Sequence, residues 1–268
     1  MATTYEAVHK TPNGPGDARP TAVHIIHDEQ LVGKWTDKTP KQLFEPGATI
    51  FATARDLNKA KSALSSIIDS NRVHLLQLDL ESLASVRTCA ENFLARSDGL
   101  NVLITNAGVM ATPEGRTVDG FETQFGTNHL AHFLLIQLLL PALQKSSKPG
   151  FQSRVIVLSS VAHRDGEVNF AGPVHPGGIM TGLMKHFSEE QKQGLGAEAR
   201  ILRLMKTPEQ GAATTIWAAT AKVHEGQGGK YLEDCQVAKP PKAGASQYDP
   251  GYSAWAYDEK KATQLWER

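Results

Sequence analysis

The sequence predicts an α/β fold in which helices pack on a parallel β-sheet. The middle of the chain alternates short apolar runs with segments of helical periodicity, as βαβ units do. Residues that favour the start of a helix stand where several of these apolar runs end. The chain has 268 residues, of which 40% are hydrophobic, so it can bury a sizeable core. We interpret residues 1–20 as a flexible arm and residues 21–268 as one domain.

The first half of this domain contains two predicted strands, each followed by a helix. Residues 48–54 form a β-rich run, and Asp56 can cap the helix that follows. Residues 73–78 form the next strand, and Ser82 can cap the second helix. The residues expected to face the core are Leu57, Ala60, Leu64, Ile67 and Ile68 in the first helix and Leu83, Val86, Ala90, Phe93 and Leu94 in the second.

The second half continues the same alternation. Residues 102–104 are wholly apolar, which suits a central parallel strand, and 155–158 form another buried strand. A long helix is predicted over 121–145, and we expect Pro141 to kink or end it. Residues 207–210 read Thr-Pro-Glu-Gln, a capping box with proline at the first helical position, so a further helix begins there.

The composition argues against several kinds of partner. Lys and Arg together number 28, as do Asp and Glu, so no excess positive charge favours nucleic acid or an anionic membrane. The most apolar stretch, 133–143, is shorter than the ~20 residues of a membrane span. Cys89 and Cys235 show no metal-binding spacing, and we expect a reduced, cytoplasmic protein. A homo-oligomer is compatible with this sequence.

Six short blocks stand where the predicted strands end and the helices begin. They are ATARD at 52–56, LDL at 78–80, TNAGV at 105–109, TNHL at 127–130, VLSS at 157–160 and HPGGIMT at 175–181. Together they resemble the short-chain dehydrogenase/reductase family, and most of all its retinol-dehydrogenase-like and WW-domain-oxidoreductase-like branch. The resemblance implies a Rossmann-like doubly wound parallel sheet. It also implies an oxidoreductase that uses NADP to interconvert a small-molecule alcohol and a carbonyl.

The resemblance implies a cofactor site assembled from several blocks. Arg55 follows a strand, where its guanidinium would favour the 2′-phosphate of NADP, unless it is an exposed arginine that begins a helix. Asp79 would bind adenine, although a capping aspartate explains it nearly as well. Asn106, Ala107 and Gly108 would let the backbone approach a ribose, and a tight turn would need the same residues.

The last cofactor residues lie in the block at 175–181. Thr181 matches the residue that binds the nicotinamide carboxamide, and Pro176 and Gly177 belong to the same cofactor-binding segment. An ordinary threonine at the start of a helix is the alternative for Thr181. The resemblance thus places NADP contacts both early and late in the chain.

Two catalytic residues are implied as well. Asn128 matches an active-site asparagine that sits in a helix and helps to hold a proton-relay water. Alternatively, it is a polar residue that bonds neighbouring backbone. Ser160 matches the serine that orients the substrate, because its hydroxyl can bond the substrate oxygen and stabilise developing charge. Its alternative role is to end a strand.

The glycine-rich turn of the family is missing. The family opens with a strand, a turn of the form Gly-x-x-x-Gly-x-Gly and a helix, whose N–H groups hold the pyrophosphate. Here residues 36–47 lead directly into the second strand. The glycines before Ala48 cannot make that spacing; they are Gly14, Gly16, Gly33 and Gly47.

The second missing part is the Tyr-x-x-x-Lys pair that serves proton transfer in the family. Neither a tyrosine nor a lysine lies between Ser160 and His175. Tyr257 and Lys261 have the right spacing but stand in a tail that resembles the family's own C-terminus. Without a positioned acid, proton transfer loses ~10²–10⁴-fold in rate, so we expect little or no activity.

The missing first strand is central in the resembling fold. Its loss leaves two parallel strands either to close up or to expose backbone and apolar groups, so we expect an incomplete sheet and marginal stability. Residues 22–26 could fill in as a strand, although that region is helical in the family. Two other roles stay open: a non-catalytic remnant that binds a partner, and a chain completed by a strand from a full-length paralogue.

Overall fold

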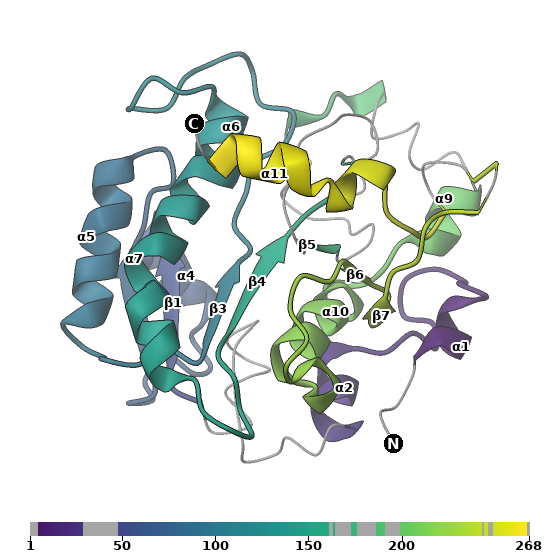
Figure 1. Cartoon of the computed structure of the whole chain (residues 1–268), viewed down its shortest axis with the longest axis horizontal. Coiled ribbons are helices and arrows are strands. Elements are labelled where there is room, and N and C mark those ends of the chain that lie inside the picture. The colour runs from purple at the N-terminus through teal and green to yellow at the C-terminus, as the bar shows by residue number, and fades with distance from the viewer. Residues whose placement is uncertain are drawn as a thin grey trace. The chain divides into compact units, whose positions relative to one another are not determined.

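Two groups of elements make up the computed structural model (Figure 1). Unit 1 comprises residues 1–30, 156–180 and 189–268, and unit 2 comprises 31–155 and 181–188. The structure describes residues 5–28, 48–160, 163, 173–175, 186–190, 199–242, 244–245 and 249–266. Each unit is described by itself below.

In unit 2, β1 (Ile50–Ala54) and β2 (Val73–Gln77) form a two-stranded parallel sheet. The residues pair in register from Ile50 opposite Val73 to Ala54 opposite Gln77. Both strands lie where the sequence predicts them. The parallel direction of β1 and β2 is the first sign of a βαβ arrangement.

The helices after these strands begin at the predicted caps. The Asp56 carboxylate accepts two backbone N–H bonds at the start of α4 (Leu57–Ala63), and the Ser82 hydroxyl accepts one at the start of α5 (Leu83–Leu94). Both caps are therefore confirmed. Leu94, expected in the core, is 44% exposed, because it lies at the margin of the face that α5 buries.

The next segment of unit 2 contains β3 (Val102–Thr105) and a long helical stretch. That stretch consists of α6 (Thr123–Phe125), the π-helical turn η1 (Gly126–Leu130) and α7 (Ala131–Ser146). Pro141 does not end the helix. It lies on the exposed side of α7, where a carbonyl that loses its helical partner can reach water.

The core of unit 2 lies between α5, α7 and β2. Helices α5 and α7 lie side by side in Figure 1 and pack against one another. The buried hydrophobic residues of this core include Leu76, Leu78, Val86, Phe93, Leu135 and Leu139.

The remaining strands lie in unit 1, except for residues 154–155, which begin one of them and belong to unit 2. In β4 (Arg154–Leu158), Leu158 pairs in parallel with Val174 of β5 (Pro173–His175). Strand β5 is parallel to β6 (Leu232–Glu233), and β6 turns back antiparallel to β7 (Gln236–Val237). Parallel strands joined through helices support the predicted α/β fold.

Helix α2 (Ala22–Asp28) packs against α10 (Pro208–Thr220), and the two lie side by side in Figure 1. Residues 22–26 therefore do not replace the missing strand. The predicted capping box at Thr207 and Gln210 is present. The shorter helices of this unit are α1 (Glu6–His9), α9 (Ala199–Leu204), η4 (Lys222–His224), η5 (Ala254–Tyr257) and α11 (Glu259–Trp266).

A buried arginine ties the N-terminal residues to the rest of unit 1. The Arg19 side chain is 3% exposed and donates hydrogen bonds to the carbonyls of Leu204 at 2.8 Å and Met205 at 2.6 Å. It also donates to the carbonyl of Gly14 and to the carboxylate of Asp17 at 2.9 Å. Arg19 thus satisfies carbonyls at the C-terminal end of α9 that would otherwise lack donors.

A buried ion pair joins the start of α10 to the turn between β6 and β7. The Lys206 Nζ lies 2.6 Å from the Asp234 Oδ1, and the side chains are 3% and 17% exposed. The His9 Nδ1 lies 3.3 Å from the same oxygen. Burial raises the pKa of the Asp234 carboxyl, but Lys206 and His9 outweigh it and hold that pKa well below its usual range.

Candidate functional site

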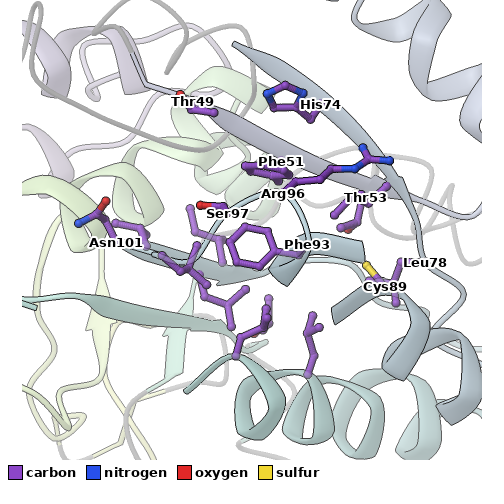
Figure 2. A pocket seen from close by; sticks show the side chains of 18 of the residues that line it. Thr49, Phe51, Thr53, His74, Leu78, Cys89, Phe93, Arg96, Ser97 and Asn101 are labelled. Carbon is purple, nitrogen blue, oxygen red and sulfur yellow. The ribbon is translucent and has the colours of Figure 1, made fainter. Parts of the chain in front are cut away.

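A cavity of about 700 Å³ occupies unit 2. It lies between the β1–β2 pair and β3, and residues of α5 and α7 complete its wall (Figure 2). Strands β1 and β3 belong to different sheets. Among the described strands, β1 and β3 are therefore not paired with each other.

The two sides of this cavity are built differently. Every residue from Gly99 to Ala107 lines it, which places the edge of β3 on the cavity rather than one face of that strand. Strand β1 contributes Phe51 and Thr53, and β2 contributes His74 and Leu76, so the β1–β2 pair presents one face. Thr49, directly before β1, continues the same alternation.

The middle of the cavity is apolar. The rings of Phe51 and Phe93 meet edge to face with centroids 4.8 Å apart, and Figure 2 shows both among the lining side chains. The Cys89 thiol lies in the same wall, and burial raises its pKa to about 11. A thiol with so high a pKa is not a nucleophile at neutral pH. Cys89 therefore contributes to the apolar wall and not to covalent chemistry.

Next to the cavity, the structure brings Asn128 and the loop after β3 together. The Asn128 Oδ1 accepts a hydrogen bond from the Val109 N–H at 2.8 Å, and its Nδ2 donates to the Val109 carbonyl at 2.8 Å. A Cβ added to Gly108 would lie 3.0 Å from the Asn128 Oδ1, so the loop packs closely on this side chain. Asn128 therefore bonds backbone, as its alternative interpretation expects, while Asn106 and Ala107 are exposed.

The helix turn that carries Asn128 is unusual. It is the π-helical η1, and such turns occur frequently at functional sites. One turn later, the His132 Nε2 lies 2.7 Å from the Ala107 carbonyl, which can only accept, so Nε2 carries the proton. Burial lowers the pKa of His132. His132 is therefore a neutral packing residue that holds the loop from its other side.

We expect Asn128→Ala to lower the free energy of unfolding by about 1–2 kcal/mol, because two hydrogen bonds to Val109 are lost. Chemical denaturation measures the loss, and hydrogen exchange of the Val109 amide should become faster. Asn128→Asp keeps the hydrogen-bond acceptor but not the donor, so it should lower the free energy of unfolding by less than Asn128→Ala does. An unchanged exchange rate at Val109 in the alanine variant would contradict this role.

Arg55 and Asp79 follow the adjacent strands β1 and β2 but do not contact each other. The Arg55 side chain is 63% exposed and pairs with Glu81 at 3.0 Å. The Asp79 carboxylate accepts the Glu81 N–H at 3.0 Å, and the Asp79 N–H donates to the Ser85 hydroxyl. Asp79 thus holds the turn before α5 but does not cap that helix, whose cap is Ser82, and the Arg55 side chain is open to solvent.

Ser160 follows β4 in unit 1, where it is exposed. Its carbonyl accepts the N–H of His163 at 3.1 Å and lies 2.8 Å from the His163 Nδ1. The His163 Nε2 accepts the Ser253 N–H, so Nδ1 carries the proton and donates to Ser160. Sequence reasoning gave His163 no such role. The predicted residues Pro176, Gly177 and Thr181 lie outside the described part of the chain.

Comparison with known proteins shows the family to which this chain belongs. Residues 36–172, about half of the sequence, match the short chain dehydrogenase family. The short-chain dehydrogenase/reductase prx1 of Penicillium roqueforti is 39% identical over 95% of this chain and 90% of that protein. This protein belongs to the short-chain dehydrogenase/reductase family. A polyprenol dehydrogenase of Mus musculus is 35% identical over 75% of this chain and 73% of its own.

Solved structures show the same fold. The NADPH-bound carbonyl reductase from chicken fatty liver superposes with a TM-score of 0.52 at 19% identity, over 85% of this chain and 98% of the reductase. Homologues in the short-chain dehydrogenase/reductase family bind NAD(P)H. The expected α/β fold and its parallel strands are therefore confirmed at the level of the family.

The prx1 relative is longer than this chain over the aligned region. The alignment with prx1 runs over 308 positions, whereas this chain has 268 residues. The relative therefore contains residues that have no counterpart in this chain. This agrees with the absence of a glycine-rich turn and of a tyrosine and lysine after Ser160 in the sequence.

The other tyrosine–lysine pair has structural partners in this short-chain dehydrogenase/reductase. The Tyr257 hydroxyl accepts the Tyr231 N–H at 2.8 Å, and the Lys261 Nζ lies 3.6 Å from the Asp258 carboxylate. These contacts hold the C-terminal segment against the rest of unit 1. Among the described residues, no cluster of three or more His, Cys, Asp or Glu could hold a metal, and no helix could span a membrane.

Proposed function

We propose that this protein is by lineage an NADP-dependent oxidoreductase that interconverts an alcohol and a carbonyl, and that this chain has little or no activity. The family match over 36–172 supports the reaction class. The sequence between Ser160 and His175 supports the loss, because it has no tyrosine or lysine to transfer a proton. The retinol-dehydrogenase-like branch and a cytoplasmic location belong to the same proposal.

In this scheme the family roles fall on residues of both units. Ser160 and Asn128 would orient the substrate. The residues that would hold the cofactor are Arg55, Asp79, Asn106, Ala107, Gly108, Pro176, Gly177 and Thr181. The exposed guanidinium of Arg55 is accessible to a 2′-phosphate, which would compete with Glu81 for it.

The described residues do not fit the pyrophosphate of NADP. A pyrophosphate binds best at a helix N-terminus whose N–H groups are open. At α4 the Asp56 carboxylate already accepts those bonds, and at α5 Ser82 and the Asp119 carboxylate do so, the latter at 2.8 Å from the Leu83 nitrogen. A second anion at either position would meet a carboxylate, so neither helix start offers a place for the pyrophosphate.

The test is NADPH-dependent reduction of a hydrophobic aldehyde by the purified chain, with prx1 measured alongside. We expect a rate at least ~10²-fold below that of prx1. Robust reduction that Ser160→Ala abolishes would contradict the proposed inactivity. Micromolar binding of NADPH in a calorimetric titration would contradict the loss of the phosphate-binding turn.

A second candidate function is that of a non-catalytic binding protein. The cavity between β1 and β3 favours it, because a sheet that has lost a strand retains the surfaces that held it. A binding role needs neither a tyrosine nor a phosphate cradle. It is tested separately from the oxidoreductase activity, by the experiment below.

A further inference from the structure

The edge of β3 that borders the cavity carries backbone hydrogen-bonding groups. The Arg154 N–H donates to the Asn101 carbonyl at 2.9 Å, so the backbone of residue 101 faces β4. Because successive residues of a strand direct these groups to opposite sides, those of Val102 and Ile104 face away from β4. Strand β4 is the one neighbour of β3 among the described strands.

The wall of the cavity that lies opposite β3 can pack against the side chains of an occupant. The β1–β2 pair presents one face, on which Phe51 and Leu76 are apolar, and Leu135 and Leu139 of α7 add to the lining. None of the described lining residues is acidic, and among them Arg96 is the one that always carries a charge. Away from Arg96, an occupant of this space would meet mainly apolar side chains on the wall formed by β1, β2 and α7.

We propose that this cavity binds an extended apolar strand of a second polypeptide, which pairs with the edge of β3 and packs on the face of β1 and β2. A small apolar molecule would cover the backbone groups of Val102 and Ile104 without bonding them, which is costly. A strand supplies the missing donors and acceptors, as in other cases of β-strand addition. Since β3 has four residues, a segment of about four to six residues suffices at ~3.3 Å per residue.

This inference is independent of the proposed oxidoreductase reaction. It needs neither NADP nor Ser160, and loss of activity would not affect it. The occupant is a strand from another chain, so the partner contributes main-chain pairing and uncharged side chains rather than a charged motif. Parallel strands buried on both faces have this composition, with near-continuous apolar residues.

The probe is a fluorescein-labelled hexapeptide, Ala-Val-Val-Ile-Ala-Gly, with two lysines appended for solubility, titrated into the full chain and followed by anisotropy. Two complementary forms carry N-methyl groups on alternate backbone nitrogens, which removes donors while the side chains stay the same. The form that is methylated on the nitrogens facing β3 should bind at least tenfold more weakly than the unmodified peptide. The other form should bind comparably to it. Equal binding of all three forms would overturn the proposal, because the cavity would then be a non-specific apolar site.

The protein variant is Ile104→Pro, which removes an N–H that faces the cavity, and proline is tolerated at such an edge. Ile104→Pro should weaken the binding of the unmodified peptide at least tenfold, whereas the control Ile104→Val should bind this peptide as the original chain does. Unchanged binding by the proline variant would contradict the pairing with β3.

If the proline variant does not fold, hydrogen exchange in the unaltered chain tests the same pairing with β3. The amides of Val102 and Ile104 should exchange faster in the free chain than in the presence of saturating peptide. Their equal protection in both states would overturn the proposal.

Discussion

Replacing Asp234 with asparagine is expected to lower the free energy of unfolding by about 3–5 kcal/mol. The substitution leaves the Lys206 ammonium buried without its counter-charge. Asp234 has a φ of 53°, a backbone conformation that asparagine also tolerates, so the change isolates the charge from the fold. Urea denaturation at neutral pH, followed by tryptophan fluorescence, measures the loss.

The matched control removes both charges. Lys206→Met combined with Asp234→Asn should cost less than Asp234→Asn alone, because no unpaired charge is left in the interior. Since the pKa of Asp234 is lowered on folding, its contribution is present above the unfolded pKa of ~3.9 and is lost as the pH falls below it. The original chain and Asp234→Asn should therefore converge in stability at acid pH. Equal stabilities at pH 7 would contradict the role of the pair.

Replacing Arg19 with methionine should lower the free energy of unfolding by about 3 kcal/mol or more. The carbonyls of Gly14, Leu204 and Met205 lose their donor, and each unsatisfied buried acceptor costs about 1–3 kcal/mol. Arg19→Lys keeps the charge but not the planar guanidinium. Its free energy of unfolding should therefore lie between those of the original chain and Arg19→Met. Denaturation curves rank the three chains, and a methionine variant as stable as the original would contradict the argument.

Asp17 gives a second readout of Arg19. Burial raises the pKa of its carboxyl, but hydrogen bonds from the Arg19 side chain and from backbone N–H groups outweigh this and lower the pKa to about 2. In Arg19→Met the side-chain bond is gone, so the pKa should rise toward its ordinary value. An NMR titration of the Asp17 carboxyl follows this directly. An unmoved pKa would show that the backbone N–H groups alone hold the carboxylate.

Features that depend on neighbouring residues could be predicted from the sequence. The caps at Asp56, Ser82 and Thr207 are local, because each side chain bonds backbone within three residues, and all three are present. Pro141 shows the limit of such rules, since its effect depends on whether the affected side of the helix meets solvent. Local pattern alone cannot supply that information.

The long-range contacts could not be predicted. Arg19 reaches carbonyls some 186 positions away, and no periodicity in the sequence marks such a pair. In the candidate site, the blocks that contain Asn128 and Gly108 were found separately, but the bonds from Asn128 to Val109 appear only in the structure. That β1 and β3 are not paired with each other among the described strands could not be predicted, because the sequence shows which strand is missing but not how its neighbours respond.

The packing of α2 on α10 has a consequence for synthesis of the chain. The Gln210 side chain bonds the Arg19 carbonyl across 191 positions of sequence. At a ribosomal rate of roughly 5–20 residues per second, the residues around Arg19 wait about 10–40 s for this partner. During that interval the apolar face of α2, including Ile25, has no surface of its own chain to cover it. The nascent protein is therefore a natural client for chaperones that hold exposed apolar segments until translation ends.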